Sequence, residues 1–286
     1  MTLQDERAGR RCHSVVNPIH SAIYFSKEIN EHYAAAGVSD PLSAYLAARA
    51  APMGAVGAGT VTATFYSFGH RVIAERVPQL WETITPQQAL ETRLEAVDAL
   101  LRRLWGEDGV ASEEVSEAAE LALRASEACG REARPLYAGN ADLPVPEAPH
   151  LALWHACTLL REHRGDGHLA VLAGAGLSGL DAQATHTASG RGMSTGWVLR
   201  TRGFTRKEWE QTLEGLTARG LLTADHELTE EGLGLRKEIE RRTDELDRAP
   251  YEHLGATGVA RLTELAGQLT LKAAESGAFP QDLIGK

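Results

Sequence analysis

The stretch "TRKEWEQTLEGLTARGLLTADHELTEEG", residues 205–232, is the part of the sequence that decides the fold. It opens with Thr205, followed three residues later by Glu208, which is the spacing of a capping box at the start of a helix. Gly220 supplies the flexible position at which helices commonly end. The apolar residues between them are spaced by four and three and share one helical face: Trp209, Leu213 and Leu216.

The second half of the stretch, "LLTADHELTEEG", indicates a tight turn between two short extended segments. Asp225 and His226 supply the polar turn, with apolar residues on either side. Thr229 then provides an N-cap for a further helix. A helix, a short β-hairpin and another helix, in this order, predict a winged helix-turn-helix.

The stretches "LEGLTARGLL" and "LTEEGLGLRKEIE" resemble the recognition-helix end, the wing and the following helix of MarR-type regulators. Over most of its length the chain is similar to an actinobacterial, MarR-like helix-turn-helix family. The resemblance implies a mainly α fold with C-terminal dimer-type helices. It also implies a homodimeric transcriptional regulator, with double-stranded DNA and a small-molecule ligand as partners. The stretches that carry it are "YLAARAAPMGAV", "ATFYSF", "LWHACTLLREHRGDGHLAVL", "TRKEWEQTLEGLTARGLL" and "ERRTDEL".

The length of 286 residues and an apolar content of 43% allow two domains, each with its own core. Residues 140–150, "NADLPVPEAPH", contain three prolines, which interrupt regular helix. We therefore expect a helical N-terminal domain over 1–142 and a winged-helix domain with C-terminal helices over 148–286. The glycines of residues 51–62 predict a loop. Helix starts are expected at three caps: Asp40, Thr85 and Ser112.

From the composition we expect a soluble, cytoplasmic protein. Its net charge of −10 argues against a protein that binds nucleic acid over its whole surface. A local basic patch remains compatible with DNA binding. Three isolated cysteines are typical of reduced thiols. The charged start "MTLQDERAGRRCHS" lacks the apolar core of a secretory signal, and no apolar run has the length of a membrane span.

Basic residues gather before and in the first turn of the predicted recognition helix, where base contacts are usually made. Two features oppose DNA binding. Glu210 and Glu214 lie four residues apart and would face phosphates, and the predicted wing has no Arg or Lys. The sequence therefore leaves DNA binding open. The candidate DNA contacts are Arg200, Arg202, Arg206 and Lys207.

The stretch "REHRGDGH", residues 161–168, has two glycines around an aspartate and predicts a turn between helices. A turn can bring His163, Asp166 and His168 to one point. There they would anchor a small molecule or, together with His155, hold a metal ion. Alternatively, Asp166 caps the following helix and the other charged residues of the stretch are solvated. The sequence indicates no particular cofactor.

Two pairs of polar residues in the N-terminal half have helical spacing: His20 with Tyr24, and Tyr45 with Arg49. Arg49 can hold a carboxylate or phosphate through two parallel hydrogen bonds. Alternatively, all four belong to a core or an interface. We expect them to border one ligand pocket with residues 163–168.

Two hypotheses about function remain open at this point. The first is a ligand-responsive regulator. The second is a winged helix repurposed as an enzyme or as a carrier of a ligand, haem or a metal, without DNA binding. A homodimer would use two apolar helix faces. These faces are in residues 86–105 and in residues 257–277, the latter with Val259, Leu262, Leu265 and Leu269.

Overall fold

The computed structural model describes residues 7–280, and the regular secondary structure in that range is entirely helical. The prediction of a mainly α fold is confirmed, but the predicted β-hairpin wing is wrong. In its place, Leu222 and Leu228 form one isolated antiparallel bridge. Gly220 ends the preceding helix and Thr229 caps the next, so each arm of the turn is too short for a ladder of strand pairs.

The described chain divides into two compact units that alternate along the sequence. Each unit contains residues from both sides of the proline-containing stretch 140–150. Three unit boundaries fall inside helices: α6 (Val77–Thr83), α11 (Pro149–Gly174) and α15 (Glu230–Leu246). The first unit comprises residues 7–55, 80–167 and 244–279, and the second comprises 56–79, 168–243 and Pro280.

The first unit is built around two helices, one near each end of the described chain. Here α1 (Ala8–Ser21) packs along α16 (Arg248–Glu275), which also packs on α9 (Glu113–Ser126). Val259 and Leu262 of α16, expected on a face for a two-fold partner, are 3% and 0% exposed because this core covers them. The remaining elements are η1 (Ala22–Phe25), α2 (Lys27–Ala35), α3 (Pro41–Ala50), η2 (Ala51–Met53), α7 (Pro86–Trp105), α8 (Glu107–Val110) and α10 (Pro135–Ala141).

The second unit has a small apolar core formed mainly by three helices. Trp209 and Leu216, which the sequence placed on one helix face, are buried there together with Val198. The backbone N–H of Gly69 donates a hydrogen bond to the carbonyl oxygen of Arg202, 2.8 Å away, and so fixes a short helical pair to this core. The core helices are α12 (Gly179–Ala188), α13 (Thr195–Thr201) and α14 (Arg206–Ala218), and the short pair is α4 (Ala58–Phe65) and α5 (His70–Ala74).

The predicted helix starts are confirmed. Asp40 and Ser112 accept hydrogen bonds from the backbone of the first turn, and Thr85 and Thr205 form full capping boxes. The loop predicted over residues 51–62 is confirmed only in part, since helices occupy both of its ends. In the described part of the chain, no helix is long and apolar enough to cross a membrane.

Candidate functional site

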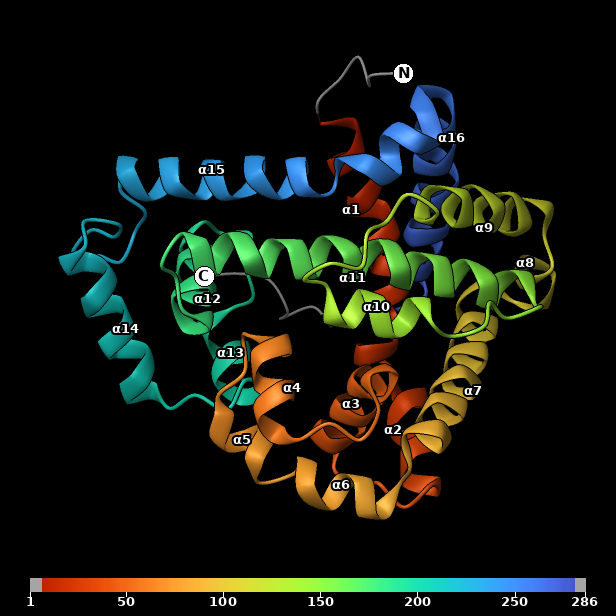
Figure 1. Cartoon of the computed structure of the whole chain (residues 1–286), viewed down its shortest axis with the longest axis horizontal. Helices are drawn as coiled ribbons and strands as arrows, with labels where there is room; N and C mark the ends of the chain where they lie inside the picture. Colours follow the sequence, from red (N-terminus) through yellow and green to blue (C-terminus); the bar gives the residue numbers. More distant parts are fainter. Residues whose placement is uncertain (1–6, 281–286) are drawn as a thin grey trace. The chain divides into compact units, whose positions relative to one another are not determined.

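Helix α11 runs without interruption through residues 161–168 (Figure 1), so the predicted turn is wrong. The two glycines had favoured the prediction of a turn, because glycine usually disfavours a helix interior. Gly167 has a packing role instead. A Cβ at this position would lie 2.6 Å from Nη1 of Arg134, whose guanidinium donates to the carbonyl oxygens of His163 and Leu246.

The helical geometry separates the three residues expected to converge. His163 Nδ1 lies 2.8 Å from Oδ1 of Asp247 in the first unit. In the second unit, His168 Nδ1 lies 2.9 Å from Oγ1 of Thr243. Asp166 caps a helix, as one alternative held, but it caps a distant one. Its carboxylate accepts the backbone N–H of Tyr137 in α10, 2.9 Å away.

The described residues offer no set of ligands for the metal ion that the sequence allowed. Among residues 7–280, no group of three or more His, Cys, Asp or Glu side chains is placed to hold an ion. His155 is 4% exposed, and burial together with the nearby Arg93 lowers its pKa to about 4. It is a neutral core residue at physiological pH.

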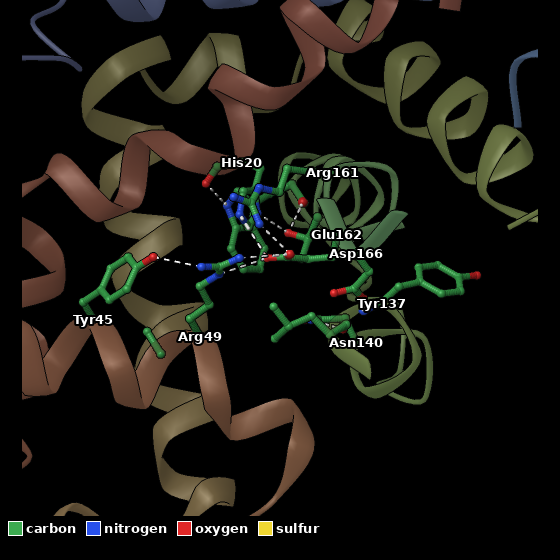
Figure 2. A network of polar contacts seen from close by, with 12 residues as sticks. His20, Tyr45, Arg49, Tyr137, Asn140, Arg161, Glu162 and Asp166 are labelled. Atoms are coloured by element: carbon green, nitrogen blue, oxygen red, sulfur yellow. Dashed lines mark hydrogen bonds and ion pairs between the residues drawn. The ribbon is translucent and has the colours of Figure 1, made fainter. Parts of the chain in front are cut away.

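The N-terminal candidates lie around Glu162, a residue that one of the alternatives for residues 161–168 held to be solvated. Glu162 is 1% exposed. Arg49 donates from Nε and Nη2 to its two carboxylate oxygens, at 3.3 and 3.4 Å, and from Nη1 to the hydroxyl of Tyr45 at 3.1 Å. Arg161 donates to the same carboxylate (Figure 2). We call His20, Tyr24, Tyr45, Arg49, Arg161 and Glu162 the Glu162 cluster.

Aromatic contacts complete the Glu162 cluster. The ring of Tyr24 meets the rings of His20 and Tyr45 edge-on, with centroids 5.4 and 5.0 Å apart. His20 stacks on Trp154 and pairs through Nδ1 with the hydroxyl of Thr158 at 2.8 Å. Tyr24 and Tyr45 are half-buried, whereas His20 is fully buried. The two tyrosines are therefore the aromatic members of the cluster that retain partial solvent exposure.

The charges of the Glu162 cluster are fixed by its surroundings. Burial alone would raise the pKa of Glu162, but Arg161 and Arg49 outweigh it and bring this pKa down to about 2. Burial lowers the pKa of His20 to about 3, so its imidazole is neutral. Nε2 of His20 is buried without a hydrogen bond and lies 3.9 Å from Oε1 of Glu162. The cluster therefore contains an ionised carboxylate beside an unpartnered ring nitrogen.

Arg93 lies next to this cluster and was also missed by the sequence analysis. It is 4% exposed, and its guanidinium carbon lies 5.2 Å from the ring centroid of Trp154. A signal existed in the sequence. Arg93 is spaced four and three residues from Ala89 and Ala96, which mark the buried face of α7. Glu162 likewise continues the buried row of Trp154 and Thr158 along α11.

The candidate DNA contacts lie on α13 and α14. Arg206 and Lys207 are exposed in the first turn of α14. Arg200 is exposed and lies over the ring of Trp197. The guanidinium of Arg202 packs on Phe68, 4.2 Å from its ring centroid, and therefore has a structural contact within the unit.

The acidic side chains of α14 differ in what they do. The carboxylate of Glu208 accepts hydrogen bonds from the backbone N–H and the hydroxyl of Thr205, both at 2.7 Å, so it is occupied in the capping box. Glu210 and Glu214 are exposed, with Gln211 exposed between them. The tip of the turn that replaces the wing carries Asp225, His226 and Glu227 and no Arg or Lys.

Comparison with known families adds one finding. A model of a helix-turn-helix family matches residues 9–280, which is nearly the whole chain. No match was found among curated proteins or among solved structures. The match spans both units, including α13, the turn after it and α14. The chain therefore belongs to this helix-turn-helix family, a membership that indicates a DNA-binding regulator.

Proposed function

We propose that the protein is a transcriptional regulator that binds double-stranded DNA through α14 and responds to a small molecule bound at the Glu162 cluster. The observation that supports DNA binding is the exposed basic pair Arg206 and Lys207 at the start of α14, in a chain that belongs to a helix-turn-helix family. Side chains at the start of a recognition helix are well placed to contact the major groove and the flanking phosphates.

The exposed face of α14 offers further groups for base recognition. Lys207 and Gln211 are both exposed and are four residues apart, so they share one face of the helix. A glutamine side chain can bind the edge of adenine through two hydrogen bonds. Glu214 continues this face and can accept a hydrogen bond from the amino group of cytosine. In this role the acidic residue contributes specificity at the expense of affinity for the phosphates.

The ligand response is proposed for the Glu162 cluster because its polar groups are arranged for recognition. Arg49 is held on two sides, by Glu162 and by the half-buried Tyr45, so its guanidinium is fixed in orientation. Binding sites typically combine aromatic side chains with a few fixed polar groups. Tyr24 and Tyr45 supply the aromatic part. Helix α11 carries Glu162 in the first unit and continues into the second unit from His168.

Fluorescence anisotropy with a labelled fragment of the DNA upstream of the protein's own gene tests the DNA-binding part. We expect the double variant Arg206→Ala/Lys207→Ala to bind at least tenfold more weakly than the unaltered protein. The matched control is Arg241→Ala/Arg242→Ala. These two exposed arginines of the same unit pair with Glu238, and their removal should change affinity little. Equal losses for the two double variants would contradict the role given to α14.

A titration of the protein–DNA complex with a metabolite extract tests the response to a ligand. We expect the extract to release the unaltered protein from its DNA and to leave the complex of Tyr45→Phe less affected, since this variant removes the hydroxyl that orients Arg49. Tyr137→Phe is the matched control, because its hydroxyl bonds the carbonyl oxygen of Cys129 outside the cluster. Release that is the same for all three proteins would reject the cluster as the ligand site.

A further inference from the structure

We propose that the first unit binds a small oxyanion, a carboxylate or a phosphate, on the guanidinium of Arg93 beside the Glu162 cluster. This inference rests on the ligand-responsive role proposed above and names the chemistry of that ligand. Arg93 is the residue that recognises the ligand, and the half-buried Tyr24 of the cluster lies near it.

Three of the five N–H donors of Arg93 have no partner in the described chain. Nη1 donates to the carbonyl oxygen of Ala48 at 3.1 Å and to Oδ1 of Asn140 at 3.4 Å. Within residues 7–280, no acceptor lies within hydrogen-bond distance of Nε or Nη2. Yet the side chain is only 4% exposed. An oxyanion that accepted these N–H groups would therefore satisfy donors of a side chain that has little contact with water.

The charge of Arg93 is also uncompensated. No described carboxylate lies within 4.0 Å of it, although Glu162 is the nearby acid that acts on its pKa. That carboxylate is already shared by Arg49 and Arg161. Asp166 makes no ion pair within the described chain and accepts a backbone N–H instead. Arg49, Arg93 and Arg161 therefore gather around Glu162, the one carboxylate that is ion-paired there, while the carboxyl of Asp166 acts on Arg49 and Arg161 without forming an ion pair.

The neutral groups around Arg93 cannot balance this charge. Burial raises the pKa of both Tyr24 and Tyr33, so their hydroxyls stay protonated. A water molecule could accept the free N–H groups, but it would bring no charge. An unpaired buried cation is costly, whereas an oxyanion supplies both the acceptor oxygens and the missing negative charge.

The geometry of the free donors selects the class of ligand. The N–H groups on Nε and Nη2 share one edge of a guanidinium, and that edge fits two oxygens of a carboxylate or phosphate. Arg49 uses the same two nitrogens to hold Glu162. Contact with the indole of Trp154 holds the Arg93 group in place. The expected ligand is therefore a small molecule with at least one carboxylate or phosphate group.

Isothermal titration of the full chain with sodium phosphate and, separately, sodium acetate tests the proposal at constant ionic strength. We expect saturable binding of one of these probes, at about one site per chain. Melting curves should show a matching rise of roughly 3–5 °C at ten times the measured Kd. Phosphate also stabilises many proteins without binding to a site. The variants Arg93→Gln and Arg103→Gln separate the two effects. Arg103 is on the same helix but pairs with Glu28, so only Arg93→Gln should lose the saturable part.

A second measurement does not depend on how well Arg93→Gln folds. Anion binding should change the tryptophan fluorescence of the unaltered protein, and the change should disappear in Trp154→Phe. The absence of saturable binding of either probe, or saturable binding that Arg93→Gln leaves unchanged, would overturn the proposal. A fluorescence change that persists in Trp154→Phe would overturn it as well. If an anion binds through Arg93 but leaves DNA affinity unaltered, the oxyanion site stands and the regulatory role of this site is rejected.

Discussion

The carboxylate of Asp166 accepts a hydrogen bond from the backbone N–H of Tyr137, 2.9 Å away, and so caps α10 from the middle of α11. An aspartate that caps a helix usually precedes it directly in sequence. Here 29 residues separate the two partners, so the bond is a tertiary link between two helices. Asp166 is 4% exposed, which makes its protonation state matter for stability.

Asp166→Asn should become more stable relative to the unaltered protein as the pH rises from 4 to 7. Burial raises the pKa of Asp166 to about 6, above the value of about 3.9 in an unfolded chain. The folded state therefore binds the extra proton between these values. The stability that this proton confers is complete below about pH 4 and is lost as the pH rises through 6. The asparagine has no such titration and still offers an oxygen to Tyr137.

Urea denaturation of both proteins at several pH values checks this prediction. The free energy of unfolding of Asp166→Asn, minus that of the unaltered protein, should grow by up to about 3 kcal/mol across this range. A difference that stays constant from pH 4 to pH 7 would show that the carboxyl titrates as it does in the unfolded chain.

Glu162→Gln should destabilise the first unit by about 3–5 kcal/mol, because it leaves the buried Arg49 and its neighbour Arg161 without their shared carboxylate. Glu238 offers a matched control, since it also binds two arginines but on an exposed surface. Replacing Glu238 by Gln should have no measurable effect, because exposed pairs are well screened by water. Similar losses for the two variants in urea denaturation would mean that burial of Glu162 adds nothing to the strength of its ion pairs.

Gly165→Ala and Gly167→Ala should change stability in opposite directions. Both glycines lie inside α11, where alanine is favoured by roughly 0.5–1 kcal/mol. A Cβ at Gly165 has room, since the nearest atom is Nη1 of Arg161 at 3.5 Å. At Gly167 the added Cβ would displace Arg134 from the two carbonyl oxygens that it binds. Melting temperatures of the two variants check this, and a rise for both would show that Arg134 moves aside without loss.

Local signals in the sequence predict most of the helices. The caps at Asp40, Thr85 and Thr205 mark real helix starts because the interaction spans only three residues. Local signals of this kind could not exclude the predicted β-hairpin wing. A turn flanked by apolar residues looks the same whether one bridge or a full ladder forms, and the helices on both sides decide the outcome.

The candidate site was predictable only in part, for a related reason. Tyr45 and Arg49 are close in sequence, and their contact follows from helical spacing. Arg93 and Glu162 are charged residues of the kind that is usually solvated, and their burial depends on which helices pack around them. The place of Gly167 inside a helix could not be predicted, for the same reason. Its partner Arg134 comes from a distant part of the chain, so the close contact that requires a glycine cannot be read locally.

The salt dependence of DNA binding tests the central claim most directly, which is that α14 contacts DNA through Arg206 and Lys207. Each phosphate contact that is lost reduces the slope of log affinity against log salt by about 0.9. Anisotropy titrations between roughly 50 and 200 mM salt should therefore show a slope shallower by about 2 for Arg206→Ala/Lys207→Ala than for the unaltered protein. Equal slopes, or no salt-sensitive binding by the unaltered protein, would contradict the account.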